Sequence, residues 1–144
     1  MEKQIQLDKL NQMNSNTLME TLEIKFTDLG EGFMEAQMPV SSKVHQPYGI
    51  LHGGASIALA ETVGSVLSVV SIDNQKFKSV GMQMTANHLK PKREGFLRAR
   101  AEFVRKGRTV HLIKIEIFDE TNELISYCHL TTSIVPNDYV LLVN

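Results

Sequence analysis

The chain has 144 residues, of which 42% are hydrophobic and 22% charged, with a formal net charge of −1 at pH 7. This composition is that of a globular protein rather than a disordered one. The near-neutral charge argues against a general nucleic-acid binder, which would need a strong excess of Lys and Arg.

Neither a secretion signal nor a membrane span is apparent. Residues 1–16 are polar and lack the apolar core of a signal peptide. The longest apolar stretch, residues 55–70, is interrupted by Glu61 and Thr62 and is shorter than the ~20 residues of a membrane span. Cys128 is the only cysteine, so no internal disulfide can form. We therefore expect a soluble, cytoplasmic protein without membrane or nucleic-acid partners.

No repeat or linker divides the sequence, so we expect one domain over residues 1–144. It would begin with a helical segment in residues 1–20 and end in a tail, residues 136–144, that extends past the last strand. Apolar residues at near-helical spacing predict one or two short helices in residues 7–22. The tail is rich in apolar residues and would suit covering a sheet edge or an interface.

Alternating apolar residues predict the first two strands. One strand is expected over residues 22–26 and a second over residues 34–40, with a turn at Glu31 and Gly32. Residues 41–51 show no periodicity, which indicates a loop.

Residues 53–71 are predicted to form the one long helix. Apolar side chains surround most of its circumference, which implies burial on most sides. Many of its residues are small, so neighbouring backbone can approach closely, as when a curved sheet wraps a helix. These small residues are Gly53, Gly54, Ala55, Ser56, Ala58, Ala60, Gly64, Ser65 and Ser68.

Four more strands are predicted over residues 77–89, 95–105, 109–119 and 123–135. Short turns join the last three, which implies an antiparallel meander with one apolar and one polar face. The layout predicts an α+β architecture that resembles the hotdog fold, with an antiparallel sheet of about six strands around one long central helix. One helix cannot cover such a sheet completely, so we expect a homodimer, and further association into a homotetramer.

The first helical turn is a candidate site because His52 immediately precedes Gly53 and Gly54. The first backbone N–H groups of a helix lack intrahelical partners and lie at the positive end of its dipole. A thioester carbonyl placed there would be polarised, as in an oxyanion hole. Glycine lets a substrate approach the backbone.

Glu61 is the only charged residue between Gly53 and Val70. It lies eight residues beyond Gly53, about two helical turns, so the two residues are expected on similar azimuths. A carboxylate in such a helix is costly to bury unless it is paired or functional. Ser65 follows one turn later and could orient the carboxylate or a water. Glu61 could then act as a general base or as a nucleophile.

The run Gln46-Pro-x-Gly-x-Leu-His-Gly-Gly, followed by Ala60-Glu61-x-x-Gly-Ser65, resembles the PaaI-type hotdog thioesterases. It is especially similar to the group that hydrolyses 1,4-dihydroxy-2-naphthoyl-CoA in menaquinone synthesis and to the related thioesterases of benzoyl-CoA derivatives such as 4-hydroxybenzoyl-CoA. The likeness extends over residues 22–135.

The resemblance implies an acyl-CoA thioesterase with an aromatic acyl group favoured. Glu61 would be the catalytic carboxylate and the Gly53 N–H would polarise the thioester carbonyl. Gln46 and His52 would position the acyl group and the thioester. In the family the site lies at the dimer interface, with Glu61 reaching across from the partner subunit. No cofactor is expected, because CoA is part of the substrate.

Residues 88–108 are strongly basic, with eight Lys or Arg against two Glu, a charge of +6; the rest of the chain therefore carries −7. Such a segment suits an anionic ligand such as the phosphates of CoA. Arg98 and Arg100 are expected to solvate the outer sheet face. The candidate CoA contacts are His88, Lys90, Lys92, Arg93, Lys106 and Arg108.

Other interpretations were weighed. Glu61 could face solvent, His52 could bond a backbone carbonyl, and Gln46, Gly53 and Ser65 could serve only turns or packing. The five histidines lack metal-site spacing and no Gly-x-Ser-x-Gly elbow exists. A non-catalytic acyl-CoA sensor on the same fold is the alternative function. A hotdog dehydratase would need a different arrangement of His and Asp or Glu.

Overall fold

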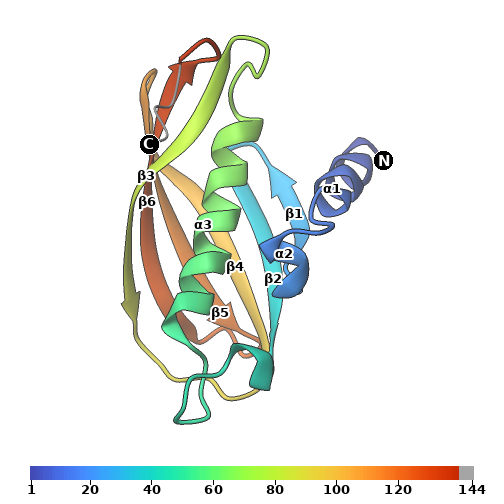
Figure 1. Cartoon of the computed structure of the whole chain (residues 1–144), viewed down its shortest axis with the longest axis vertical. Coiled ribbons are helices and arrows are strands. Elements are labelled where there is room, and N and C mark those ends of the chain that lie inside the picture. Colours follow the sequence, from blue (N-terminus) through green and yellow to red (C-terminus); the bar gives the residue numbers. More distant parts are fainter. Residues whose placement is uncertain (140–144) are drawn as a thin grey trace.

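The computed structural model of the chain describes residues 1–139, in which one six-stranded antiparallel sheet has the strand order β1-β2-β4-β5-β6-β3. Helix α3 lies lengthwise along one face of the curved sheet, and α1 and α2 lie beside β1 and β2 (Figure 1). The predicted hotdog layout is therefore confirmed. The strands are β1 (Lys25–Gly30), β2 (Phe33–Val40), β3 (Phe77–His88), β4 (Gly95–Lys106), β5 (Val110–Asp119) and β6 (Leu124–Pro136). The helices are α1 (Glu2–Gln12), α2 (Leu18–Thr21), the 3-10 turn η1 (Ser42–Val44) and α3 (Gly53–Val70).

Small side chains on α3 face the sheet. Ser56, Ala60, Gly64 and Ser68 recur at every fourth position, and all four are buried. A Cβ atom on Gly64 would lie 2.9 Å from Cδ2 of Leu130 on β6, closer than real Cβ contacts allow. The expectation that small residues let the sheet approach the helix is confirmed.

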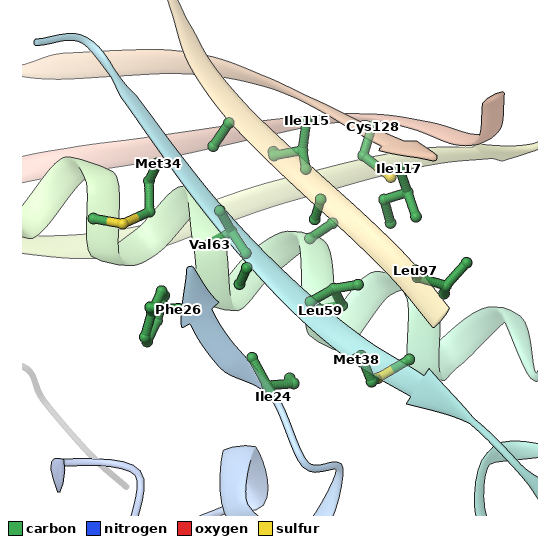
Figure 2. Packing of buried hydrophobic residues seen from close by; sticks show 14 of the residues in the cluster. Ile24, Phe26, Met34, Met38, Leu59, Val63, Leu97, Ile115, Ile117 and Cys128 are labelled. Atoms are coloured by element: carbon green, nitrogen blue, oxygen red, sulfur yellow. The ribbon is translucent and has the colours of Figure 1, made fainter. Parts of the chain in front are cut away.

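Large apolar side chains from α3 and the strands fill the remaining space between helix and sheet. Figure 2 shows Leu59 and Val63 of α3 among apolar side chains of the strands, including Met38 of β2 and Ile115 of β5, and these four residues are 0% exposed. By length and composition alone α3 could also cross a membrane. In this fold, however, it is the core helix, and eight of its residues are buried.

The strands predicted after α3 agree with the structure to within about a residue at each end, whereas the first predicted strand does not. Strand β1 begins at Lys25, because the preceding turn places Glu23 at φ 58°, in the left-handed region. Ile24 and Phe26 are buried, as their alternation predicts, but the ladder with β2 shifts register after Phe26. A local bulge therefore ends the alternation on which the prediction depended.

The N-terminal segment forms two helices, and it is fastened to the outer edge of β1. The side-chain amide of Asn11 donates to the Phe26 carbonyl at 3.0 Å and its Oδ1 accepts from the Phe26 N–H at 2.8 Å. Asn14 donates to the Ile24 carbonyl at 3.0 Å. These side chains satisfy backbone groups that an edge strand otherwise leaves open.

The start of the C-terminal tail is held by polar contacts near the end of α3. Asn137 donates its side-chain amide to the Asn74 carbonyl at 3.1 Å, and Lys78 donates to the Tyr139 carbonyl at 2.7 Å. Residues 140–144, which carry most of the apolar tail named in the sequence analysis, lie outside the described residues.

A cluster of polar side chains is buried between α3, β3, β5 and β6. Ser68 Oγ lies 2.8 Å from His111 Nδ1, 2.8 Å from Ser79 Oγ and 2.9 Å from Thr132 Oγ1. His111 is 2% exposed, and the edge of its ring meets the ring of Phe103. Burial lowers the pKa of His111 below its usual value, and the positive charge of Lys106 lowers it further.

The buried imidazole predicts that folding stability falls in mild acid. Below the unfolded-state pKa of ~6.5 the unfolded chain binds a proton that the folded chain does not, so the free energy of unfolding falls by up to about 1.4 kcal/mol per pH unit. The effect is absent above that pKa and is complete once the pH falls below the lowered folded-state pKa. Urea unfolding of the wild type and of His111→Gln between pH 5 and pH 8 measures it. Equal pH slopes for the two proteins would contradict the prediction.

Candidate functional site

His52 caps the N-terminus of α3. Its Nδ1 accepts a hydrogen bond from the Gly54 N–H at 2.8 Å. Because Nδ1 is the acceptor, the ring proton lies on Nε2. The His52 N–H donates to the Val44 carbonyl at 2.8 Å, and the Leu51 N–H donates to the Lys92 carbonyl at 2.7 Å. The loop before α3 is thus fixed on both sides, and the His52 ring binds backbone as an acceptor from the Gly54 N–H, not as a donor to a carbonyl.

The Gly53 N–H is the one early donor of α3 that remains open. The Ala55 N–H donates to the His52 carbonyl at 3.0 Å, and Gly54 is satisfied by the His52 ring. Within residues 1–139 the Gly53 N–H makes no hydrogen bond. Gly53 borders a cavity of about 290 Å³. An oxygen with negative charge would be stabilised there by this N–H and by the helix dipole.

Gln46 borders the same cavity from the loop that precedes α3. Its backbone closes a tight turn, because the Gln46 N–H donates to the Ile50 carbonyl at 2.8 Å and the Gly49 N–H donates to the Gln46 carbonyl at 2.9 Å. Its side-chain Oε1 accepts from the Tyr48 N–H. This contact fixes the amide in orientation, and its NH₂ group has no acceptor among the described residues.

His88 reaches the cavity from the last position of β3. A Cβ atom on Gly53 would lie 2.8 Å from His88 Nε2, so the imidazole packs directly against the first residue of α3. His88 Nδ1 lies 2.9 Å from Oγ of Ser126 on β6. Ser126 is fully buried and also lines the cavity. The sequence analysis missed Ser126, because a serine on an alternating strand carries no signal of its own.

Glu61 and Ser65 lie on another side of α3, in a groove of about 500 Å³. Leu18 and Met19 of α2 also line this groove, a contribution that no sequence pattern indicated. Glu61 is exposed, and its Oε1 lies 3.4 Å from the position that a Cβ on Gly81 would take. Within residues 1–139 its carboxylate has no hydrogen bond and no ion pair. The remaining lining residues are Gly54, Ile57, Ala58, Thr62 and Val66.

The structure separates Glu61 from Gly53. Eight residues of α-helix span about 12 Å along the axis, and at ~100° per residue the two positions differ by about 80° in azimuth. The similar azimuths expected from the sequence are therefore wrong for a single chain. The carboxylate and the open N–H face different hollows.

The basic residues proposed for CoA lie at two ends of the fold. Lys90 and Lys92 border the cavity at the N-terminal end of α3. Both are paired, Lys90 with Glu123 at 3.5 Å and Lys92 with Glu120 at 2.6 Å. Arg93 follows in the same connection and is exposed, with a guanidinium nitrogen 3.9 Å from where a Cβ on Gly49 would lie.

Lys106 and Arg108 lie far from this cavity. Lys106 borders a groove formed with Val70 and Ser71 at the C-terminal end of α3, and its ammonium lies 5.7 Å from the centre of the Phe103 ring. Arg108 is exposed between β4 and β5. One chain alone therefore does not bring all six predicted CoA contacts together.

Groups that could hold a metal ion were also sought. Within residues 1–139 no three His, Cys, Asp or Glu side chains gather closely enough to do so. Among the groups that line the two hollows at α3 are a carboxylate, an imidazole, a side-chain amide and an open backbone N–H donor.

Comparison with known proteins gives a consistent result. Residues 48–126 match the family model described as "Thioesterase superfamily". The chain is 39% identical over 134 residues to the 1,4-dihydroxy-2-naphthoyl-CoA hydrolase of Escherichia coli. The matched segment covers 93% of this chain and 98% of that protein.

Solved structures agree with this match. A thioesterase from Haemophilus influenzae superposes with a TM-score of 0.88 at 39% identity, covering 92% of each chain. A Staphylococcus aureus protein, solved as a glutamate-to-alanine variant, superposes with a TM-score of 0.80 at 40% identity, covering 83% of this chain and 98% of that one. A glutamine-to-alanine variant of the same enzyme, which is described as a thioesterase, has also been solved.

The cap formed by His52 predicts a difference between two substitutions. His52→Ala removes the acceptor of the Gly54 N–H and is expected to lower the free energy of unfolding by about 0.5–2 kcal/mol. His52→Asn keeps an acceptor at the cap and is expected to stay close to the wild type. Urea unfolding measures both, and equal stability of His52→Ala and His52→Asn would contradict a capping role.

Proposed function

The chain belongs to the thioesterase superfamily and is a thioester hydrolase; on that premise we propose that it cleaves aromatic acyl-CoA at a site shared by two copies of the chain. The observation that carries this proposal is the separation of about 12 Å along α3 between Gly53 and Glu61. A carbonyl carbon must lie ~3 Å from its attacking atom while its oxygen meets the oxyanion donor. Gly53 and Glu61 of one chain also border different hollows, which supports a site that a second copy completes.

The outer edge of β3 supports a second copy. Within residues 1–139, β3 pairs only with β6, so its other edge has no partner, whereas the edge of β1 is covered by α1. Three apolar side chains on or beside this strand are exposed, Met82 at 65%, Phe77 at 40% and Leu89 at 58%. Such an edge favours pairing with another strand. In the proposed homodimer the two β3 strands pair, and dimers associate further into a tetramer.

The proposed chemistry uses Gly53 of one copy and Glu61 of the other. The Gly53 N–H polarises the thioester carbonyl, and Glu61 either takes a proton from the attacking water or attacks the carbonyl itself. The electron pair of the C=O bond moves to the oxygen, where the N–H stabilises it. Collapse then breaks the C–S bond and releases the CoA thiolate, which takes up the proton that Glu61 removed from the water. If Glu61 attacks instead, water then cleaves the resulting anhydride, restores the Glu61 carboxylate and releases the free acid, and the proton lost by that water goes to the thiolate.

The groove beside Glu61 is the proposed acyl pocket. Its apolar side chains, among them Ile57, Val66, Leu18 and Met19, suit a flat hydrophobic group. The Escherichia coli relative is named for a naphthoyl-CoA substrate, which supports an aromatic acyl group here.

The two Staphylococcus aureus variants also support the assigned residues. The substituted glutamine and glutamate lie fifteen residues apart in that protein, the same separation as Gln46 and Glu61 here. We propose that Gln46 and His52 position the thioester, and that Lys90, Lys92, Arg93, Lys106 and Arg108 include the contacts to CoA.

Removal of the Glu61 carboxylate tests the chemistry. Glu61→Gln and Glu61→Ala are expected to lower kcat by about 10²- to 10⁴-fold. Because Glu61 is exposed and unpaired within the described residues, thermal unfolding should be unchanged. The measurement is thiol release from naphthoyl-, benzoyl-, phenylacetyl- and straight-chain acyl-CoA, with the aromatic substrates expected to be faster.

One control variant tests whether the loss is specific to Glu61, and one property of the chain limits the background in the thiol assay. Glu31→Gln removes an exposed carboxylate from the β1–β2 turn and should keep wild-type turnover. Burial raises the pKa of the Cys128 thiol to about 11, so this cysteine should add little to the thiol signal. Wild-type turnover by both Glu61 variants would refute the proposed chemistry.

Mixed dimers test the shared site. Gly53→Val blocks the approach to the N-terminus of α3, and Glu61→Gln removes the carboxylate, so each homodimer is expected to be inactive. A dimer with one chain of each kind contains one intact site. Equal mixing with subunit exchange should therefore restore about one quarter of wild-type activity. Mass spectrometry verifies that subunits have exchanged. If activity does not recover after exchange, the whole site lies within one chain.

A further inference from the structure

We propose that the Nε2–H of His88, held in orientation by Ser126, is a second donor to the thioester oxygen beside the Gly53 N–H. This inference rests on the proposed function and assigns His88 a role at the carbonyl rather than at the phosphates of CoA. Ser126 is then a positioning residue, since it acts through the imidazole.

The first step is the position of Ser126. It lies directly opposite His88 in the β3–β6 ladder, its side chain is 0% exposed, and its Oγ lies 2.9 Å from His88 Nδ1. Within residues 1–139 the Ser126 hydroxyl has no other hydrogen-bond partner. Two strands of one sheet therefore fix the distance between the hydroxyl and the ring.

The second step is the placement of the ring hydrogens. A buried hydroxyl with one available acceptor must donate to it, because a buried unpaired O–H costs about 1–3 kcal/mol. In the neutral ring, Ser126 therefore donates to Nδ1 and the ring proton lies on Nε2. In the charged ring, Nδ1–H donates to Ser126 and Nε2 again carries a hydrogen. In both forms Nε2–H is a donor.

The third step is where this donor lies. His88 Nε2 is 2.8 Å from the position of a Cβ on Gly53. The N and Cβ atoms of one residue are ~2.5 Å apart, so Nε2 lies within about 5.3 Å of the Gly53 nitrogen. An oxygen at ~2.9 Å from each nitrogen is therefore within hydrogen-bond distance of both. Both residues line the same cavity, which can admit that oxygen.

The fourth step accounts for glycine at position 53. Alanine there keeps the backbone N–H, but its Cβ would collide with Nε2 at 2.8 Å and with Cδ2 at 3.0 Å of the imidazole. Gly53→Ala thus displaces one donor while it retains the other. The two donors can be separated by experiment.

The tests use the aromatic acyl-CoA that the wild type hydrolyses fastest among naphthoyl-CoA and benzoyl-CoA. Ser126→Ala is expected to lower kcat about tenfold, and His88→Ala about a hundredfold, with KM changed less than about twofold. Ser126→Cys keeps a weak donor of similar size and should recover part of the loss. Ser133→Ala removes a hydroxyl that points to the other face of β6 and should behave as the wild type.

A double-mutant cycle adds a readout that a merely structural role would not produce. Gly53→Ala and Ser126→Ala should each lower kcat in the wild type but have little further effect in His88→Ala, since both act through the ring. Additive losses would overturn the proposal. So would a rise in KM at constant kcat for His88→Ala, which would place His88 on CoA.

One measurement reads the ring hydrogens in the wild type directly. The ¹H–¹⁵N spectrum of the wild-type histidines, with His88 identified by its absence in His88→Ala, should show Nε2 protonated from pH 6 to pH 8. A protonated Nδ1 with a bare Nε2 would overturn the proposal even if Ser126→Ala failed to fold. Failure here is distinct from failure of the proposed function, which would appear as an inactive wild type or as fully active Glu61 variants.

Discussion

The close contact between α3 and the sheet determines the geometry of everything else in this fold. Ser56, Ala60, Gly64 and Ser68 form a buried stripe with no large side chains, and Gly64 leaves no room for a Cβ against Leu130. Such packing fixes the rotation of the helix about its own axis as well as its distance from the strands. At ~100° per residue, that rotation turns Glu61 and Ser65 out of the buried stripe to one flank of the helix, where Glu61 Oε1 lies 3.4 Å from the position of a Cβ on Gly81 of β3. The exposed carboxylate is therefore a consequence of the buried stripe.

On the proposed chemistry, the same rigid helix keeps one chain from completing its site alone. A straight α-helix cannot shorten the path between Gly53 and Glu61, so a shared carbonyl requires that one of the two groups come from elsewhere. The sheet has one edge covered by α1 and one edge, β3, left open within residues 1–139. On the proposed dimer, the edge that would otherwise favour aggregation is the one that assembles the active site. Association and catalysis then depend on the same strand.

Patterns carried by many residues were predictable from the sequence, whereas single contacts across the fold were not. The long helix and the last four strands follow from periodicity over ten or more residues, and they agree with the structure. Strand β1 was misplaced because a positive φ at Glu23 and a bulge after Phe26 are local events that alternation does not reveal. The six basic residues were grouped by closeness in sequence, yet a β-strand of twelve residues, Gly95–Lys106, carries Lys106 to the far end of the fold. Ser126 joins the site only through the β3–β6 register, which no single sequence pattern gives.

The N-terminus of α3 differs from an ordinary helix start in how its donors are used. A helix begins with four N–H groups that lack intrahelical partners. Here the His52 N–H bonds to Val44, Gly54 to the His52 ring and Ala55 to the His52 carbonyl. Only the Gly53 N–H is left open within the described residues. It is therefore the one backbone donor through which the positive end of the dipole can bind a ligand oxygen. A bound oxygen is thereby held at one point, and on our proposal the His88 Nε2–H is the second donor to that oxygen.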